Sequence, residues 1–154
     1  MKIELLSFTP DMAEKYENFI KKCFEVLGWE YGKYDKGDDA RIIDGVSLGY
    51  AALWCLMREG EIIGSVAVRA LDKEKSVAEL KRLYVSPNEQ GKGYGETLFK
   101  TAYLYAAQNG YKILRADTTK DRAASRHLLQ KYGFVPTSDY NGNPYAELFY
   151  ECVL

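Results

Sequence analysis

The segment from residue 76 to residue 110 restricts the fold of this chain more than any other part of the sequence. Ser76–Val85 is predicted to be a strand that extends a meander, and the apolar spacing after residue 95 is that of a helix. Between the two stand Gly91, Gly93 and Gly95. Glycines in such a turn allow positive φ and close approach of a ligand, while free backbone N–H groups and the helix dipole attract an anion. The sequence therefore predicts an anion cradle between a strand and a helix.

Helical and extended patterns alternate along the rest of the sequence, which predicts a mixed α/β sheet in a single domain over residues 1–154. Further strands are predicted at 2–8, 50–58, 61–71, 111–118, 134–140 and 145–154, and helices at 10–28, from the end of the 90–95 turn to 108 and between 119 and 132. Trp29–Gly49 is predicted to be a loop with one short helix near residues 40–43. Thr118 and Asp121 have the spacing of a capping box for the last helix, and Asn141–Pro144 predicts a turn between the last two strands.

The charge distribution argues against a general nucleic-acid binder but favours a compact anion. The net charge is −1, from 21 basic and 22 acidic residues. Residues 80–131 nevertheless contain ten basic and four acidic residues. The positive charge is therefore concentrated in the third of the chain that carries the glycine turn.

Other parts of the composition exclude metal and membrane classes. A single histidine, His127, cannot form a zinc site at motif spacing, and Cys23, Cys55 and Cys152 are predicted to be reduced core residues without a nucleophilic role. The longest apolar run, Tyr50–Met57, has eight residues, whereas a membrane-spanning helix needs about 20. The first residues lack the pattern of a secretory signal, so a cytoplasmic location is expected.

The glycine turn departs from the common phosphate-binding motifs. Ser86 stands where a Walker A loop has its first glycine, and Glu96 stands where a dinucleotide fingerprint has its last. Lys92–Phe99 matches part of an RNA-recognition strand, but its stacking aromatic position is again Glu96 and its periodicity is helical. An RNA-binding module is therefore the less favoured alternative.

The same turn resembles the central motif of the GNAT superfamily of N-acetyltransferases, which reads Gln/Arg-x-x-Gly-x-Gly/Ala between a strand and a helix. Residues 90–95, Gln-Gly-Lys-Gly-Tyr-Gly, fit every fixed position. The resemblance extends upstream through residues 78–85 and downstream through residues 128–134. It implies a mostly antiparallel central sheet that is flanked by helices and splayed at the strand that binds the acyl-CoA.

The resemblance also implies acetyl-CoA as the cosubstrate, without a metal. The backbone of Leu83, Tyr84 and Val85 would pair with the pantetheine arm, and a backbone N–H near Val85 would polarise the thioester carbonyl. The pyrophosphate would lie on the turn formed by Gln90, Gly91, Lys92, Gly93, Tyr94, Gly95 and Glu96. Arg122 stands where many members have an asparagine, and it would also contact the cofactor.

Glu79 is the predicted catalytic base, because several members of the family place a glutamate at this position. An amine with a pKa near 10 is mostly protonated at pH 7, so a base must take its proton. Strand alternation puts Glu79 on the face of Leu83 and Val85. A surface glutamate that offsets Lys81 or Arg82 is the alternative.

The usual proton donor of the family is missing. Many members have a tyrosine on the last helix that protonates the departing thiolate, but the corresponding residue here is Leu129. Tyr132, three residues further on, is the remaining candidate for this role.

The resemblance therefore predicts an N-acetyltransferase that transfers acetyl to a primary amine of a small molecule or peptide by direct attack in a ternary complex. A non-catalytic acyl-CoA sensor on the same fold is the alternative that Leu129 keeps open. The acceptor pocket would be lined by Trp29–Tyr50 and Tyr140–Tyr145, where the aspartates of the first loop would favour a cationic amine. No nucleic acid or membrane partner is expected, and a homodimer is left open.

Overall fold

The structure is a computed structural model that describes residues 2–31 and 49–154. Its strands are β1 (Ile3–Ser7), β2 (Ala52–Arg58), β3 (Glu61–Asp72), β4 (Val77–Val85), β5 (Ile113–Thr118), β6 (Val135–Pro136) and β7 (Leu148–Val153). Its α-helices are α1 (Ala13–Leu27), α3 (Tyr94–Gln108) and α4 (Ala123–Lys131), and two single 3-10 turns, η1 (Pro10–Met12) and η2 (Pro87–Glu89), precede α1 and the glycine turn. The short helix predicted near residues 40–43 lies outside the described residues.

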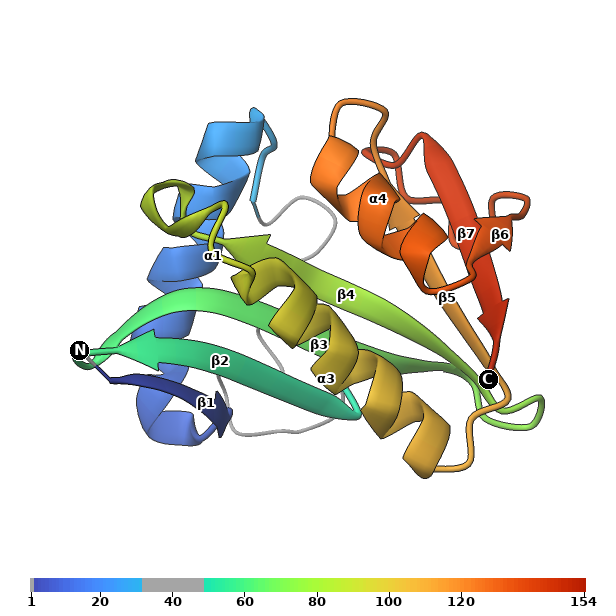
Figure 1. Cartoon of the computed structure of the whole chain (residues 1–154), viewed down its shortest axis with the longest axis horizontal. Coiled ribbons are helices and arrows are strands. Elements are labelled where there is room, and N and C mark those ends of the chain that lie inside the picture. Colours follow the sequence, from blue (N-terminus) through green and yellow to red (C-terminus); the bar gives the residue numbers. More distant parts are fainter. Residues whose placement is uncertain (1, 32–48) are drawn as a thin grey trace.

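The seven described strands form one sheet in the order β1-β2-β3-β4-β5-β7-β6 (Figure 1). Every neighbouring pair is antiparallel except β4 and β5, which are parallel because α3 carries the chain back across the sheet between them. The predicted mixed, mostly antiparallel sheet is therefore confirmed.

Helices cover both faces of the sheet and separate two apolar cores. On one face, the buried stripe of α3, which includes Leu98 and Ala102, packs with Leu128 and Leu129 of α4 against the sheet. On the other face, Tyr16 and the remaining buried side chains of α1 pack against β2, β3 and β4. Each of these helices thus buries one face, as the 3.6-residue spacing of its apolar residues predicts.

The sheet opens between β4 and β5. Their ladder covers only three residue pairs, from Val77 opposite Ile113 to Glu79 opposite Arg115. Beyond these pairs β4 continues to Val85 and β5 to Thr118, and the two strands diverge (Figure 1). This divergence is the predicted splay.

Two local predictions near the C-terminus are wrong. The last hairpin was expected to have strands at 134–140 and 145–154, but β6 has two residues, and residues 137–147 form a long connection. Asn141 and Asn143 in this connection hydrogen-bond to carboxylates on other strands, which competes with strand pairing. The capping box also does not form, because α4 begins only at Ala123 and Asp121 accepts a hydrogen bond from the hydroxyl of Thr119.

A β-bulge interrupts β4 at Arg82. Tyr84 lies opposite Ser65, while Lys81 lies opposite Ala67, so β4 has one residue more than β3 in this stretch. Arg82 has a φ of +57°, which is unusual for a residue with a side chain, and its carbonyl accepts a 2.7 Å hydrogen bond from the Ser65 hydroxyl. The bulge reverses the alternation of β4 after residue 82.

Candidate active site

The glycine turn adopts the conformation that an anion cradle needs. Gly91 and Gly93 have φ of +80° and +85°, and a Cβ at either position would meet no protein atom within 4 Å. Both glycines are therefore needed for the positive φ of the backbone and not to avoid a steric clash, and the space beside them is open. Helix α3 begins at Tyr94, directly after the turn, so its N-terminal dipole faces the same space.

A buried ion pair holds the start of the turn. Glu89 is 5% exposed, and its carboxylate accepts hydrogen bonds from both terminal nitrogens of the Arg58 guanidinium, one of them at 2.9 Å. The ammonium group of Lys92 lies 3.0 Å from the same carboxylate. Gln90 donates from its side-chain amide to the Val85 carbonyl at 3.2 Å. Two of the predicted cofactor-binding residues, Lys92 and Gln90, thus stabilise the turn in this structure.

Glu96 and Tyr132 meet at the first turn of α3. The Lys131 ammonium lies 3.0 Å from one Glu96 oxygen, and this hydrogen bond lowers the pKa of Glu96. The Tyr132 hydroxyl donates to the other oxygen at 3.4 Å, and its ring packs on Phe99. Burial, followed by the nearby Glu96 charge, raises the pKa of Tyr132.

A cavity occupies the opening between β4 and β5. Its walls come from residues 80–84 of β4, residues 116–119 at the end of β5, and Arg122, Ser125 and Leu129 near α4. Arg122 spans this opening: its guanidinium donates to the Leu83 carbonyl at 3.0 Å and lies 5.3 Å above the ring of Tyr84. The structure therefore brings Arg122 together with the predicted pantetheine-binding strand.

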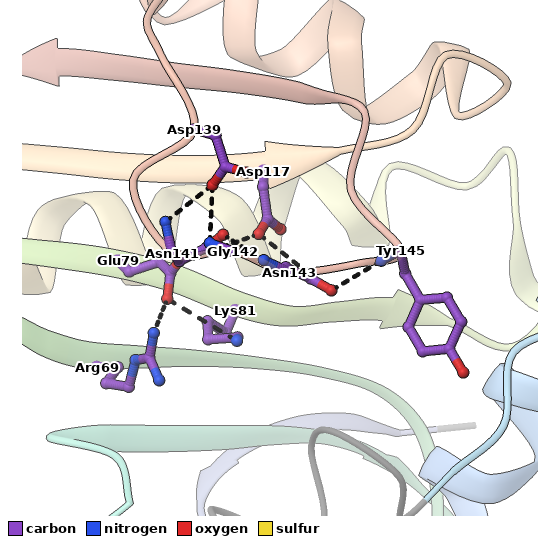
Figure 2. A network of polar contacts seen from close by, with 9 residues as sticks. All are labelled: Arg69, Glu79, Lys81, Asp117, Asp139, Asn141, Gly142, Asn143 and Tyr145. Carbon is purple, nitrogen blue, oxygen red and sulfur yellow. Dashed lines mark hydrogen bonds and ion pairs between the residues drawn. The ribbon is translucent and has the colours of Figure 1, made fainter.

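Glu79 lies at the closed end of the opening, in a polar network (Figure 2). It is fully buried. The Arg69 guanidinium donates to one of its oxygens at 2.7 Å, and the Asn141 side-chain amide donates to the other at 2.8 Å. The Lys81 ammonium lies 3.9 Å away. A surface role for Glu79 is thus excluded.

The expected facing of Glu79 is wrong. Glu79 shares the sheet face of α1 with Tyr84, whereas Leu83 and Val85 pack against the core under α3. The cause is the bulge at Arg82, which shifts the alternation by one residue. Tyr132 also lies away from Glu79, beside the start of α3, so the structure does not bring the two predicted catalytic residues together.

The connection before β7 supplies residues that the sequence did not single out. The Asn141 side chain donates to Asp117 at 2.6 Å as well as to Glu79, and the Asn143 side chain donates to Asp117 at 3.2 Å (Figure 2). The only local signal was the Asn-Gly-Asn-Pro sequence, which equally predicts a simple turn.

Aromatic side chains also line the cavity. The ring of Trp29, after α1, stacks on that of Tyr145 at 5.4 Å, and both residues line the cavity. The Tyr145 hydroxyl accepts a hydrogen bond from the Glu30 backbone N–H at 3.1 Å. Trp29 and Tyr145 belong to the two ranges expected to line the acceptor pocket, which stays a prediction, and the aspartates at 35, 38, 39 and 44 lie outside the described residues.

The structure of the described residues can also be compared with the RNA-binding, metal-binding and membrane-spanning classes that the sequence argued against. Lys92–Phe99 forms a turn and a helix, which contradicts the strand that RNA recognition by this pattern requires. Within residues 2–31 and 49–154, the structure shows no cluster of three or more histidine, cysteine or acidic side chains placed to hold a metal. No helix in these ranges is long and apolar enough to cross a bilayer. All three cysteines are free and buried.

A parallel strand pair that splays beside a glycine turn and a helix N-terminus is the arrangement that the resemblance to the GNAT superfamily implies. Residues 14–134 match the Acetyltransferase (GNAT) family. The chain belongs to this family.

Comparison with individual proteins agrees with the family. The chain is 32% identical to an N-acetylaspartate synthetase of Xenopus tropicalis over 84 residues, which are 54% of this chain and 31% of that protein. It covers between 28% and 55% of the length of the curated relatives it matches.

Solved structures share the fold over almost their full length. A GNAT-family acetyltransferase from Staphylococcus aureus superposes with a TM-score of 0.83 at 14% identity, covering 97% of this chain and 98% of that one. The PaiA N-acetyltransferase of Thermoplasma acidophilum, solved in complex with coenzyme A, superposes with a TM-score of 0.74 at 18% identity over the full length of both chains.

Proposed function

We propose that this chain is an acetyl-CoA-dependent N-acetyltransferase in which a primary amine of a small molecule or peptide attacks the thioester directly, in a ternary complex. The observation that carries this proposal is the opening between β4 and β5. It begins at Glu79, the last residue of β4 that pairs with β5, and ends at the glycine turn after Val85. An anion cradle and a buried carboxylate thus stand at the two ends of one opening.

The chain has a place for each part of the cosubstrate, which when bound supplies an acetyl group activated as a thioester. The turn from Gln90 to Glu96 would hold the pyrophosphate on its backbone N–H groups, because Gly91 and Gly93 leave open space there. The backbone of Leu83–Val85 would bind the pantetheine arm. The contact of Arg122 with the Leu83 carbonyl supports its place beside this arm.

In the reaction, the amine nitrogen forms a bond to the acetyl carbon and the C–S bond breaks. An acceptor that enters as an ammonium ion loses two protons in all, of which one ends on the thiolate and the other in solvent. Glu79 is the proposed base, and its burial beside the closed end of the opening supports this role. Tyr132 is the proposed proton donor; its raised pKa keeps the phenol protonated at neutral pH.

A second candidate function is binding of acetyl-CoA without turnover. Leu129 favours it, because this apolar side chain lines the cavity and cannot supply a proton to a thiolate. Turnover with an amine separates the two functions.

The test is release of the coenzyme A thiol from acetyl-CoA in the presence of free amino acids, polyamines and short peptides. Aspartate belongs in this panel because a relative is named N-acetylaspartate synthetase. With the best acceptor, Glu79→Gln is expected to lower kcat by about 10²-fold or more while the Kd of acetyl-CoA is unchanged. Glu4→Gln, an exposed change on β1, is the matched control. An unchanged kcat in Glu79→Gln would remove the base, and an inactive wild-type protein would favour the sensor.

A further inference from the structure

Asp117 carries a negative charge that no cation in the described part of the chain balances. It is the second-last residue of β5, and its side chain lines the cavity. Its contacts are the neutral side-chain amides of Asn141 and Asn143, and no lysine or arginine among residues 2–31 and 49–154 pairs with it. Glu79 differs, because Arg69 lies 2.7 Å from its carboxylate.

The geometry of Asp117 leaves one oxygen available. Both amides donate to Oδ2, at 2.6 and 3.2 Å, whereas Oδ1 has no hydrogen bond within the described residues. The two bonds fix the orientation of the carboxylate from the side of the 137–147 connection. A half-buried carboxylate held in this way, without a counterion, favours a cationic hydrogen-bond donor as its ligand.

Thr118, the next residue of β5, adds a second polar group to the wall of the cavity. Its side chain is 4% exposed and lines the cavity, and its hydroxyl has no hydrogen-bond partner among the described residues. An unpaired buried hydroxyl is unfavourable, so a polar ligand that bonds to it is stabilised relative to an apolar one. Because neighbouring strand residues point to opposite faces, Asp117 and Thr118 present their polar atoms on either side of β5.

We propose that Asp117 binds the ammonium group of the acceptor, so that the acceptor enters as a charged primary amine at the end of β5. This inference rests on the proposed acetyltransferase function and assigns its acceptor site. Asn141 and Asn143 are positioning residues, because they hold the Asp117 carboxylate without a charge of their own. Asn141 also bonds to Glu79, which places the proposed base next to the ammonium site (Figure 2).

The test compares charge removal at Asp117 with the same change elsewhere. Asp117→Asn is expected to raise the KM of the best panel amine at least tenfold, with the Kd of acetyl-CoA unchanged by calorimetry. Asp117→Ser, which removes the charge with a smaller side chain, is expected to do the same, and Asp117→Glu to recover part of the loss. Asp72→Asn, at the last residue of β3, is the matched control and should keep the wild-type KM, since asparagine can still accept the Lys75 backbone N–H.

A neutral analogue gives a second readout. The alcohol in which a hydroxyl replaces the reactive amine is expected to bind the wild-type protein as an inhibitor, with an inhibition constant at least tenfold above the KM of the amine. Asp117→Asn should abolish this difference between the two constants. A wild-type KM in folded Asp117→Asn or Asp117→Ser would overturn the assignment while leaving the acetyltransferase function intact. A wild-type protein that binds acetyl-CoA and acetylates no amine would contradict the proposed function, and the acceptor site would fall with it.

Discussion

Replacing Gly93 by alanine separates the backbone role of the glycine turn from its role in binding the cofactor. A Cβ at this position would meet no protein atom within 4 Å, so the methyl group disturbs no packing. The positive φ of +85° nevertheless strains an L-residue, and the expected loss of stability is about 1–2 kcal/mol. The methyl group would project into the open space where the pyrophosphate is proposed to lie.

Gly110 provides a matched control for the strain. It has a φ of +83°, a Cβ there would also meet nothing within 4 Å, and it lies after the opposite end of α3, a helix about 22 Å long. Gly110→Ala should therefore lose a similar amount of stability without any effect on the cradle. Urea unfolding of both variants measures this shared loss.

The two variants should differ in their affinity for acetyl-CoA. Gly93→Ala is expected to bind at least tenfold more weakly than the wild-type protein, which corresponds to about 1.4 kcal/mol, and Gly110→Ala to bind as the wild type does. Calorimetric titration at one temperature decides the question. Equal affinities of Gly93→Ala and the wild type for acetyl-CoA would refute the cradle. An equal loss of acetyl-CoA affinity in Gly93→Ala and Gly110→Ala would attribute the effect to backbone strain alone.

Three further outcomes are expected. Arg58→Met should destabilise the fold by about 3 kcal/mol in urea unfolding, because it leaves the buried Glu89 carboxylate with only Lys92; a change below about 1 kcal/mol would show that the pair is not needed. Tyr132→Phe should lower kcat by about 10²-fold with the KM of acetyl-CoA kept if the phenol protonates the thiolate, whereas an unchanged kcat would leave Tyr132 a packing role on Phe99. Burial raises the pKa of Cys23 and of Cys55 from 9.0 to about 12, so at pH 8 their thiolate fractions fall about 10³-fold and iodoacetamide should label them only after unfolding, as mass spectrometry can check.

The parts of the fold that depend on neighbouring residues could be predicted from the sequence. The glycine turn follows from three glycines between a strand pattern and a helix pattern, although α3 begins at Tyr94, inside the range 90–95 expected for the turn. The buried stripes of α1 and α3 follow from apolar spacing alone. The parallel β4–β5 pair follows from the single helix between them.

The parts that depend on distant residues could not be predicted in this way. The bulge at Arg82 could not be predicted locally, because no glycine stands at this position of positive φ. The Ser65 hydroxyl on β3 donates a hydrogen bond to the Arg82 carbonyl from the neighbouring strand. The bulge places Leu83 and Val85 on the face opposite to Glu79. Likewise, the Asn-Gly-Asn-Pro sequence looks like a hairpin turn until Glu79 and Asp117 come within reach of Asn141, and no local pattern encodes this contact.

The most direct test of the whole account is a calorimetric titration of the purified protein with acetyl-CoA, with NADH, ATP and a short RNA as comparison ligands. The account predicts selective binding of acetyl-CoA at one molecule per chain, because one opening between β4 and β5 leads to one glycine turn. Absence of acetyl-CoA binding, or equal binding of ATP or RNA, would contradict the proposed cradle and the acetyltransferase function that rests on it.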